Sequence, residues 1–156
     1  MTTDAKTIKH HTAGAIVLTD AAPVKVLLVH HKKFKSWVEP GGHQEAWENS
    51  HEAAIREVRE ETGVDIAPYV DGIRPLTDDV AHIPAPKYLL EEKISAYGDQ
   101  PEHYHIDSLY IVRIPEQEVA FDQNESHGIG WFLLEELENM PMLEDFRKIL
   151  LQEMTQ

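Results

Sequence analysis

The sequence predicts an α/β domain in which a mixed β-sheet lies between helices. Strand-like segments stand before, around and after one well-marked helix, and a second helical pattern closes the chain. The length of 156 residues suits one domain, and a hydrophobic content of 42% can supply one core. We therefore expect residues 1–156 to form a single domain, with residues 1–10 as a candidate flexible tail.

Apolar runs bounded by turn residues indicate the strands of this sheet. Residues 71–86 interrupt the pattern, because three prolines and one glycine there indicate a long irregular connection of the kind that often shapes a substrate pocket. Another strand-like stretch follows the polar loop that contains Glu125. We expect strands over residues 12–18, 24–29, 32–38, 64–69, 87–97, 104–114 and 130–134.

The central helix has marked ends. Asn49 and Glu52 have the spacing of a capping box, and Gly63 suits the left-handed residue just past a helix terminus. The residues between them are mostly good helix formers, without proline or glycine. The sequence therefore predicts a helix from about Ser50 to Thr62.

A second helix is predicted at the end of the chain. Pro141 separates a short turn from this helix, because proline cannot continue a helical hydrogen-bond pattern. The apolar residues of the helix recur at helical spacing and are expected to face the core. They are Leu143, Phe146, Ile149 and Leu150.

Three glutamates occupy one side of the central helix. At roughly 100° per residue, Glu57, Glu60 and Glu61 fall within an arc of about 100° that is displaced from the apolar side. Ionised carboxylates at these spacings repel one another. A hard cation such as Mg²⁺ or Mn²⁺ offsets that repulsion and commonly bridges carboxylates to substrate phosphates. The alternative is a solvated acidic face without a ligand.

The segment before the helix bears on this choice. It ends in Gly41-Gly42, a pair that lets the backbone approach a ligand or metal closely. From Gly42 the chain carries a glutamate after five residues, an arginine-glutamate pair after seven more, then a glutamate pair, a glycine and Val64. This segment resembles the signature of the Nudix hydrolases at every defined position. The resemblance implies a Nudix-like α/β/α sandwich over most of the chain.

The resemblance also implies roles for individual residues. Arg56 matches the arginine that orients the carboxylates, whereas Gly42 and Glu48 match supporting positions. Glu125 is the candidate for a further catalytic group from a late loop, with an ordinary loop acid as the alternative. The implied ligands of Mg²⁺ or Mn²⁺ are the backbone carbonyl of Gly41 and the side chains of Glu57, Glu60 and Glu61.

The implied reaction is hydrolysis of a nucleoside diphosphate linked to another moiety, NDP-X, to NMP and phosphate-X. Metal neutralises charge on the diphosphate and lowers the pKa of bound water, and a glutamate collects the proton. Glu57 is the first candidate for this base and Glu125 the second. One alternative is a catalytically silent nucleotide-binding or sensing module of the same fold. Another is a metallohydrolase built on three residues that alternate onto one strand face, His103, His105 and Asp107.

Three further residues are candidates for substrate binding. His43 follows the glycine pair and could reach a phosphate, and Lys33 and Lys35 could attract an anionic substrate. Each has a structural alternative, since loop histidines and hairpin lysines often have no specific ligand. Loops outside the signature determine specificity, so nucleoside triphosphates, nucleotide sugars and other NDP-X compounds all stay open.

Composition narrows the function classes. The chain has no cysteine, which excludes disulfides and thiol nucleophiles and weighs against the isopentenyl-diphosphate isomerase branch of the superfamily. A formal charge of -14 disfavours a long nucleic acid, but not a small nucleotide carried in with its metal. No segment resembles a secretory signal or has the apolar length to cross a bilayer. We expect a cytoplasmic enzyme without a membrane partner, and family tendency alone suggests a homodimer.

Overall fold

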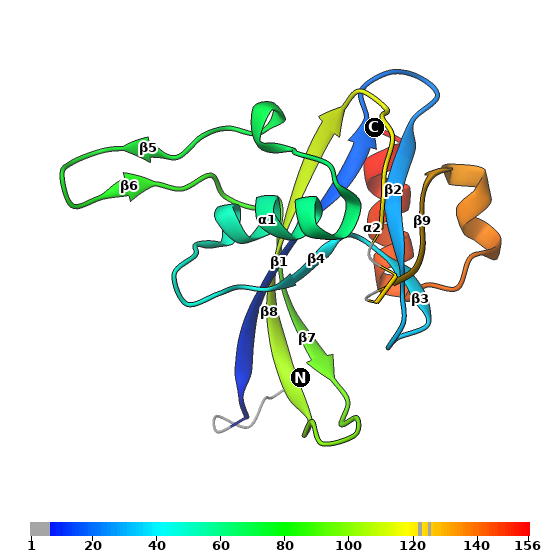
Figure 1. Cartoon of the computed structure of the whole chain (residues 1–156), viewed down its shortest axis with the longest axis horizontal. Coiled ribbons are helices and arrows are strands. Elements are labelled where there is room, and N and C mark those ends of the chain that lie inside the picture. Colours follow the sequence, from blue (N-terminus) through cyan, green and yellow to red (C-terminus); the bar gives the residue numbers. More distant parts are fainter. Residues whose placement is uncertain (1–6, 122, 125) are drawn as a thin grey trace.

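Strand β1 (Lys9–Thr19) is the centre of the fold. The computed structural model describes residues 7–121, 123–124 and 126–156. β1 pairs in parallel along its whole length with β8 (His103–Ile114), a strand from the last third of the chain. On its other side, β8 pairs with antiparallel β7 (Tyr88–Ile94), and the β7–β8 hairpin extends beyond the helices beside the start of β1 (Figure 1).

The second edge of β1 is shared by two short pairings. Its C-terminal end pairs with antiparallel β2 (Lys25–His31), and its middle pairs with antiparallel β4 (Gly41–His43). The strand order is β3-β2-β1-β8-β7, and β9 pairs with β2. The remaining strands of this sheet are β3 (Ser36–Val38) and β9 (Ser126–Leu133), while β5 (Arg74–Pro75) and β6 (Ala81–His82) form a separate hairpin.

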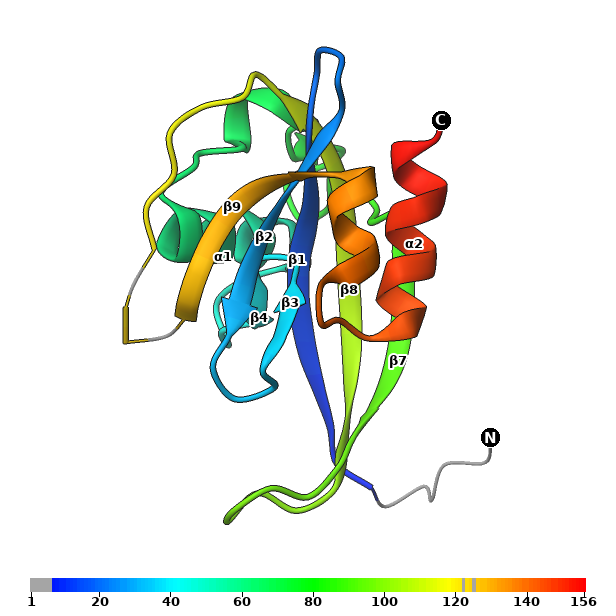
Figure 2. The ribbon, with the colours of Figure 1, turned by 90° about the vertical axis from the view of Figure 1, so that its right-hand side faces the viewer.

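Helices cover both faces of the sheet, as the sequence predicted. Figure 2 shows α1 (Ser50–Thr62) on one side and α2 (Glu144–Met154) on the other, with the 3-10 helix η2 (Leu134–Asn139) beside α2. Two apolar clusters join these layers, one against each helix. The mixed sheet and its two helical layers therefore confirm the expected α/β/α sandwich.

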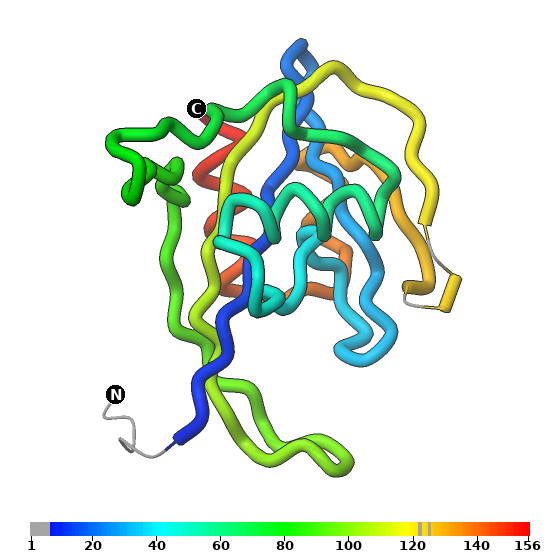
Figure 3. Tube along the Cα trace, turned by 60° about the vertical axis from the view of Figure 1, so that its left-hand side comes forward, coloured from blue at the N-terminus to red at the C-terminus, as the bar shows by residue number. Residues whose placement is uncertain are grey.

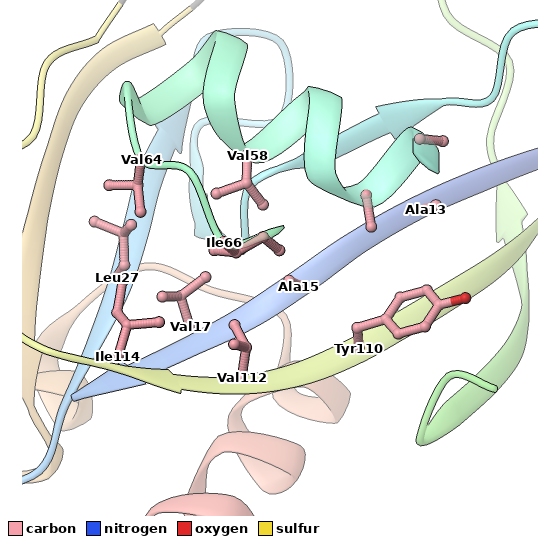
Figure 4. Packing of buried hydrophobic residues seen from close by; sticks show 12 residues of the cluster. Ala13, Ala15, Val17, Leu27, Val58, Val64, Ile66, Tyr110, Val112 and Ile114 are labelled. Atoms are coloured by element: carbon pink, nitrogen blue, oxygen red, sulfur yellow. The ribbon is translucent and has the colours of Figure 1, made fainter. Parts of the chain in front are cut away.

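The alternation of side chains along β1 explains its continuous apolar sequence. Ala13, Ala15 and Val17 belong to the cluster under α1, where Val58 covers them (Figure 4). Ile16 belongs to the opposite cluster, under α2. Because both faces of β1 are buried, apolar residues are needed at successive positions and not only at alternate ones.

One predicted strand is wrong. Residues 64–69 form no strand but an irregular turn that ends in the 3-10 helix η1 (Ala67–Tyr69). Pro68 lies at the start of this helix and has no N–H to offer a strand ladder, and the side chain of Asp65 accepts a hydrogen bond from Ala67 N at 3.0 Å. Val64 and Ile66 are nevertheless buried in the core, which explains why their pattern resembled a strand.

Other boundaries differ by a few residues. β1 begins at Lys9, so it takes residues 9–10 of the expected tail into the sheet. Residues 32–35 form the turn of the expected hairpin, and only Ser36–Val38 form its second strand. The connection over residues 71–86 is mostly irregular but includes the β5–β6 hairpin, which projects away from the sheet in Figure 1 and is seen nearly end-on in Figure 3.

Candidate active site

Helix α1 holds the signature carboxylates, and its ends are those that the sequence predicted. The side chain of Asn49 accepts a hydrogen bond from Glu52 N at 2.9 Å, and the side chain of Glu52 accepts one from Asn49 N at 3.1 Å, so the capping box is complete. At the other end Gly63 has φ 77°, and its N–H donates to the Arg59 carbonyl at 2.9 Å. These caps fix the rotation of the glutamates relative to the sheet.

The glycine pair lets β4 lie in a very narrow space between β1 and α1. A Cβ on Gly41 would stand 2.8 Å from the Ala13 carbonyl oxygen, and a Cβ on Gly42 would stand 2.6 Å from Oε1 of Glu57. Neither position can therefore take a side chain without displacing backbone or this carboxylate. The close contact brings the backbone of β4 directly against the carboxylate of Glu57.

Arg56 organises the acidic residues around it into what we call the Arg56 cluster: Arg56, Glu48, Glu57 and Glu60. Its Nε and NH2 donate to the two carboxylate oxygens of Glu48 at 2.6 and 2.9 Å, a bidentate pair. Its NH1 donates to Oε1 of Glu57 at 2.8 Å and to Oε2 of Glu60 at 3.1 Å. These hydrogen bonds from Arg56 hold the pKa of Glu48 below its usual range.

The third signature glutamate is held by the backbone of β4. Gly41 N donates to Oε2 of Glu61 at 3.2 Å, which links the glycine pair to the end of α1. Side-chain exposure falls from 56% at Glu60 to 13% at Glu57, so the carboxylates extend from solvent towards the interior. Carboxylate and carbonyl oxygens in this arrangement suit a hard divalent cation. Within residues 7–121, 123–124 and 126–156, however, the ligand atoms that gather most closely are not those of these glutamates.

Histidines form that closer group. Ligand nitrogens of His10, His43 and His105 all lie within 4.8 Å of one another. The sequence suggested instead that His105 and His103 share a site with Asp107. The structure does not bring Asp107 into this group. Asp107 lies further along β8, where its Oδ1 accepts a hydrogen bond from the Thr12 hydroxyl at 2.9 Å.

Asp107 belongs to a second set of acids, which we call the Asp107 cluster: Asp107, Glu92 and Glu39. Burial and the charge of Asp107 raise the pKa of Glu92 to about 7, and the two carboxyl groups share a hydrogen bond. The same two causes raise the pKa of Glu39, just before the glycine pair. Burial also raises the pKa of Asp107, although the Thr12 hydroxyl acts in the opposite direction. This cluster therefore retains protons in a pH range where isolated carboxylates do not.

The candidates for substrate binding occupy different surroundings. His43 is exposed at the end of β4 and turns towards His10 and His105. Lys33 places Nζ 5.1 Å from the centre of the Tyr97 ring, and its charge contributes to lowering the pKa of His43 and His105. Lys35 lies in the β2–β3 turn with φ 50°. Glu125 lies outside the described residues.

Sequence reasoning missed Glu39, Glu92 and His10. The alternation of residues 103, 105 and 107 correctly placed three side chains on one face of β8. The partners of that face come from β1, β4 and β7, and only strand pairing brings them there. The adjacent histidines in the first half of β1 were the one sequence signal that could have pointed to His10.

Comparison with known proteins agrees with this geometry. A sequence model described as the NUDIX domain matches residues 9–154. The chain belongs to the Nudix family. A solved NUDIX-family hydrolase from Clostridium perfringens superposes with a TM-score of 0.70 at 23% identity, covering 94% of this chain and 96% of that one, which shows the same fold.

Two curated relatives bear on the activity. A Bacillus subtilis (strain 168) protein named "Putative 8-oxo-dGTP diphosphatase" is 28% identical over 121 residues, which cover 78% of this chain. A Lactococcus lactis subsp. cremoris (strain MG1363) protein named "Probable DHNTP pyrophosphohydrolase" is 32% identical over 137 residues, which cover 88%. The matches span 66% and 69% of those relatives' own lengths. Family and relatives together identify a Nudix-type diphosphohydrolase.

In the part of the chain that the structure describes, neither helix reaches the length and apolar character that a bilayer span requires.

Proposed function

We propose that this Nudix protein hydrolyses NDP-X compounds to NMP and phosphate-X with Mg²⁺ or Mn²⁺ bound at the Arg56 cluster. The observation that carries the proposal is the contact between the Gly42 backbone and the Glu57 carboxylate, with Arg56 on the same carboxylate. The proposed ligands are the Gly41 carbonyl, Glu57, Glu60 and Glu61. Oxygen donors of this kind are the ones that Mg²⁺ and Mn²⁺ prefer.

Each residue around the reaction has a proposed part. Arg56 holds one oxygen of Glu57 and one of Glu60, and Gly41 N–H holds one oxygen of Glu61, so the carboxylates keep a fixed orientation. When bound, the divalent ion supplies charge neutralisation on the diphosphate and a water of lowered pKa. Glu57, 13% exposed, is the first proposed acceptor of the water proton. Glu125 stays the second, and Gly42 and Glu48 support the arrangement.

Positive charge near the cluster favours an anionic substrate. The charge of Lys33 contributes to lowering the pKa of His43, which directly follows the glycine pair, so the ammonium group lies near enough to His43 to act on it electrostatically. In a protein of net charge -14, such a group locally offsets the repulsion of phosphates. We propose Lys33, Lys35 and His43 as substrate-binding residues on this side.

The names of the curated relatives suggest which triphosphates to test first. One name specifies 8-oxo-dGTP, an NDP-X compound in which X is a phosphate group, and the other specifies DHNTP, a pterin triphosphate and not a nucleotide, so the preferred substrates are expected to carry a triphosphate. A panel containing these compounds, ordinary nucleoside triphosphates and nucleotide sugars is incubated with Mg²⁺ or Mn²⁺, and hydrolysis is measured as NMP or, for the triphosphates, as released pyrophosphate. Tight binding without product from any compound would favour a silent binding module instead.

Substitution of the proposed ligands tests the site. We expect Glu57→Gln and Glu60→Gln to abolish Mg²⁺-dependent turnover, because an amide binds a divalent cation far more weakly than a carboxylate. Glu138→Gln, at an exposed position of η2, is the matched control and should keep full activity. Unchanged rates in the two α1 variants would reject the assignment.

The narrow space at Gly42 allows a second, independent test. In Gly42→Ala the new Cβ must displace the Glu57 carboxylate, so kcat should fall by about 100-fold, the typical effect of misplacing a catalytic group by roughly 1 Å. Gly72→Ala is the control, because a Cβ there meets no atom within 4 Å. Equal kcat values for the two variants would show that contact with Gly42 does not position Glu57.

A further inference from the structure

The start of the sheet brings together three histidines that are far apart in the sequence. His10 of β1 lies opposite His105 of β8 in the parallel register, and His43 ends β4, which pairs with β1 from the other side. The His43 ring centre lies 5.4 Å from that of His10 and 5.0 Å from that of His105. Three adjacent strands therefore direct one imidazole each to a common point.

The surroundings of this point suit a small ligand. An open depression of about 360 Å³ is lined by His10 and His43 and by the residues that follow β4, including Gln44 and Glu45. Nδ1 of His10 is buried and has no hydrogen-bond partner, which is an unfavourable state for a polar atom. His10 and His43 thus border a depression that is open to solvent, and the protein supplies no hydrogen-bond partner for Nδ1 of His10.

A fourth histidine, His103, supports the ring of His105. Its Nε2 lies 3.2 Å from Nε2 of His105, and its Nδ1 lies 2.9 Å from the Pro101 carbonyl oxygen, which can only accept. Such outer partners typically orient metal-binding imidazoles.

We propose that His10, His43 and His105 form a second metal site, specific for a late first-row divalent ion such as Zn²⁺ and separate from the oxygen-ligand site at the Arg56 cluster. Imidazole nitrogens suit Zn²⁺ and its neighbours, whereas Mg²⁺ prefers oxygen. Three histidines leave a fourth tetrahedral position for water or a substrate group.

The ion requires only modest adjustment of the side chains. Zn–N bonds of about 2.0–2.1 Å imply nitrogens about 3.3 Å apart in a tetrahedral site, compared with separations of up to 4.8 Å here. His43 is exposed at the end of its strand and can rotate towards the other two. Its backbone carbonyl accepts a hydrogen bond from Arg56 NH2 at 3.0 Å, so an ion at this site also restrains the residue next to the Arg56 cluster.

Zn²⁺ titration of the untagged, metal-free protein of 156 residues tests the proposal. The measurement is made in a Glu57→Gln/Glu60→Gln background, which removes competition from the carboxylates. Isothermal titration calorimetry should show one Zn²⁺ per chain, and Co²⁺ should give the intense visible absorption of a tetrahedral complex. The result that overturns the proposal is absence of stoichiometric binding in this background.

Histidine variants assign the binding to this site. His43→Gln and His105→Ala should each weaken Zn²⁺ binding by at least about tenfold, since even outer partners of a ligand cost that much. His82→Ala, on the exposed β6, is the matched control and should bind as the parent does. Because His43 is exposed, its substitution should leave the melting temperature of the metal-free protein unchanged, which separates lost binding from lost folding. Equal affinity in all three variants would place the ion elsewhere and overturn the assignment.

Discussion

The Arg56 cluster and the Asp107 cluster both crowd carboxylates together, but they reduce the repulsion by different means. In the Arg56 cluster a guanidinium group donates to three glutamates, and the pKa of Glu48 is lowered. In the Asp107 cluster the neutral hydroxyl of Thr12 donates to Asp107, and the pKa of Glu92 is raised to about 7. The pKa of a carboxylate is thus lowered in one cluster and raised in the other.

This difference matches the chemistry that we propose for each region. Charged carboxylates can bind a divalent ion, whereas protonated ones can donate a hydrogen bond and repel a substrate phosphate less. The third signature glutamate lies close enough to the Asp107 cluster for electrostatic interaction, since the charge of Glu61 also contributes to the raised pKa of Glu39. The direction of the pKa shift therefore differs between Glu48, beside the proposed cation site, and Glu39, just before the glycine pair.

Removal of the guanidinium should have the largest effect. Arg56→Met leaves the Glu48 carboxylate, 8% exposed, without its bidentate partner, so we expect a loss of about 2–3 kcal/mol in unfolding free energy. Turnover should fall by at least about 100-fold, because Glu57 and Glu60 lose their orientation. Urea unfolding and kcat measure the two effects. Arg59→Met is the control, since its exposed pair with Asp65 should contribute under about 1 kcal/mol. Similar losses in both variants would contradict the role of Arg56.

Removal of the neutral donor should have a smaller effect on the other cluster. Thr12→Val deletes the hydroxyl that donates to the buried Asp107 Oδ1. The free energy of unfolding should fall by about 1.5 kcal/mol when Asp107 is charged. The loss should shrink as the pH falls through the range in which Asp107 takes up a proton, because a protonated Asp107 depends less on the donor. Thr12→Ser keeps the hydroxyl and should lose less. A loss independent of pH would show that Thr12 acts through packing alone.

Glu92 gives the protein a pH-dependent stability with a definite sign. Its folded pKa of about 7 is above the ordinary value of 4.5, so the folded state binds the proton more tightly than the unfolded chain does. The resulting stabilisation is fully present below about pH 4.5 and is lost as pH rises through about 7. Because glutamine resembles the protonated acid, Glu92→Gln should raise the melting temperature by a few degrees at pH 8 and change it less at pH 5. A larger gain at pH 5 would reverse the assignment.

The smallest expected effect is that of divalent ions on the melting temperature, and it should depend on one cluster only. Mg²⁺ should raise the melting temperature slightly, and EDTA should remove this gain, because a cation stabilises the state that binds it. The shift should disappear in Glu57→Gln but persist in Glu92→Gln. A thermal scan without any Mg²⁺-dependent shift would indicate that the ion enters only together with the substrate, as weak Mg²⁺ sites permit.

Local sequence signals predicted α1 and the orientation of its glutamates well. The capping box and the glycine at the end act within a few residues, so spacing alone was sufficient to place Ser50–Thr62. The same reasoning failed for residues 64–69, because burial of Val64 and Ile66 in an irregular segment produces the same apolar alternation as a strand. Pro68 was the local signal against a strand there.

The remainder of the site depends on contacts that spacing cannot supply. Gly41 N reaches Glu61 only because β4 lies between β1 and α1. His10 joins His105 through a parallel pairing of strands from opposite ends of the chain. Alternation placed the polar residues of β8 on one face, but the partners of that face could be known only from the sheet.

The parallel pairing of β1 with β8 also affects how this protein folds during synthesis. Thr12 and Asp107, joined by a hydrogen bond across that pairing, are 95 positions apart in sequence. While the ribosome is still adding the residues after α1, one side of β1 presents unpaired N–H and C=O groups to any neighbouring polypeptide. Closure of so long a loop is entropically unfavourable and slow. Pairing of β8 with β1 should therefore limit the folding rate and determine how long the unpaired edge of β1 can aggregate.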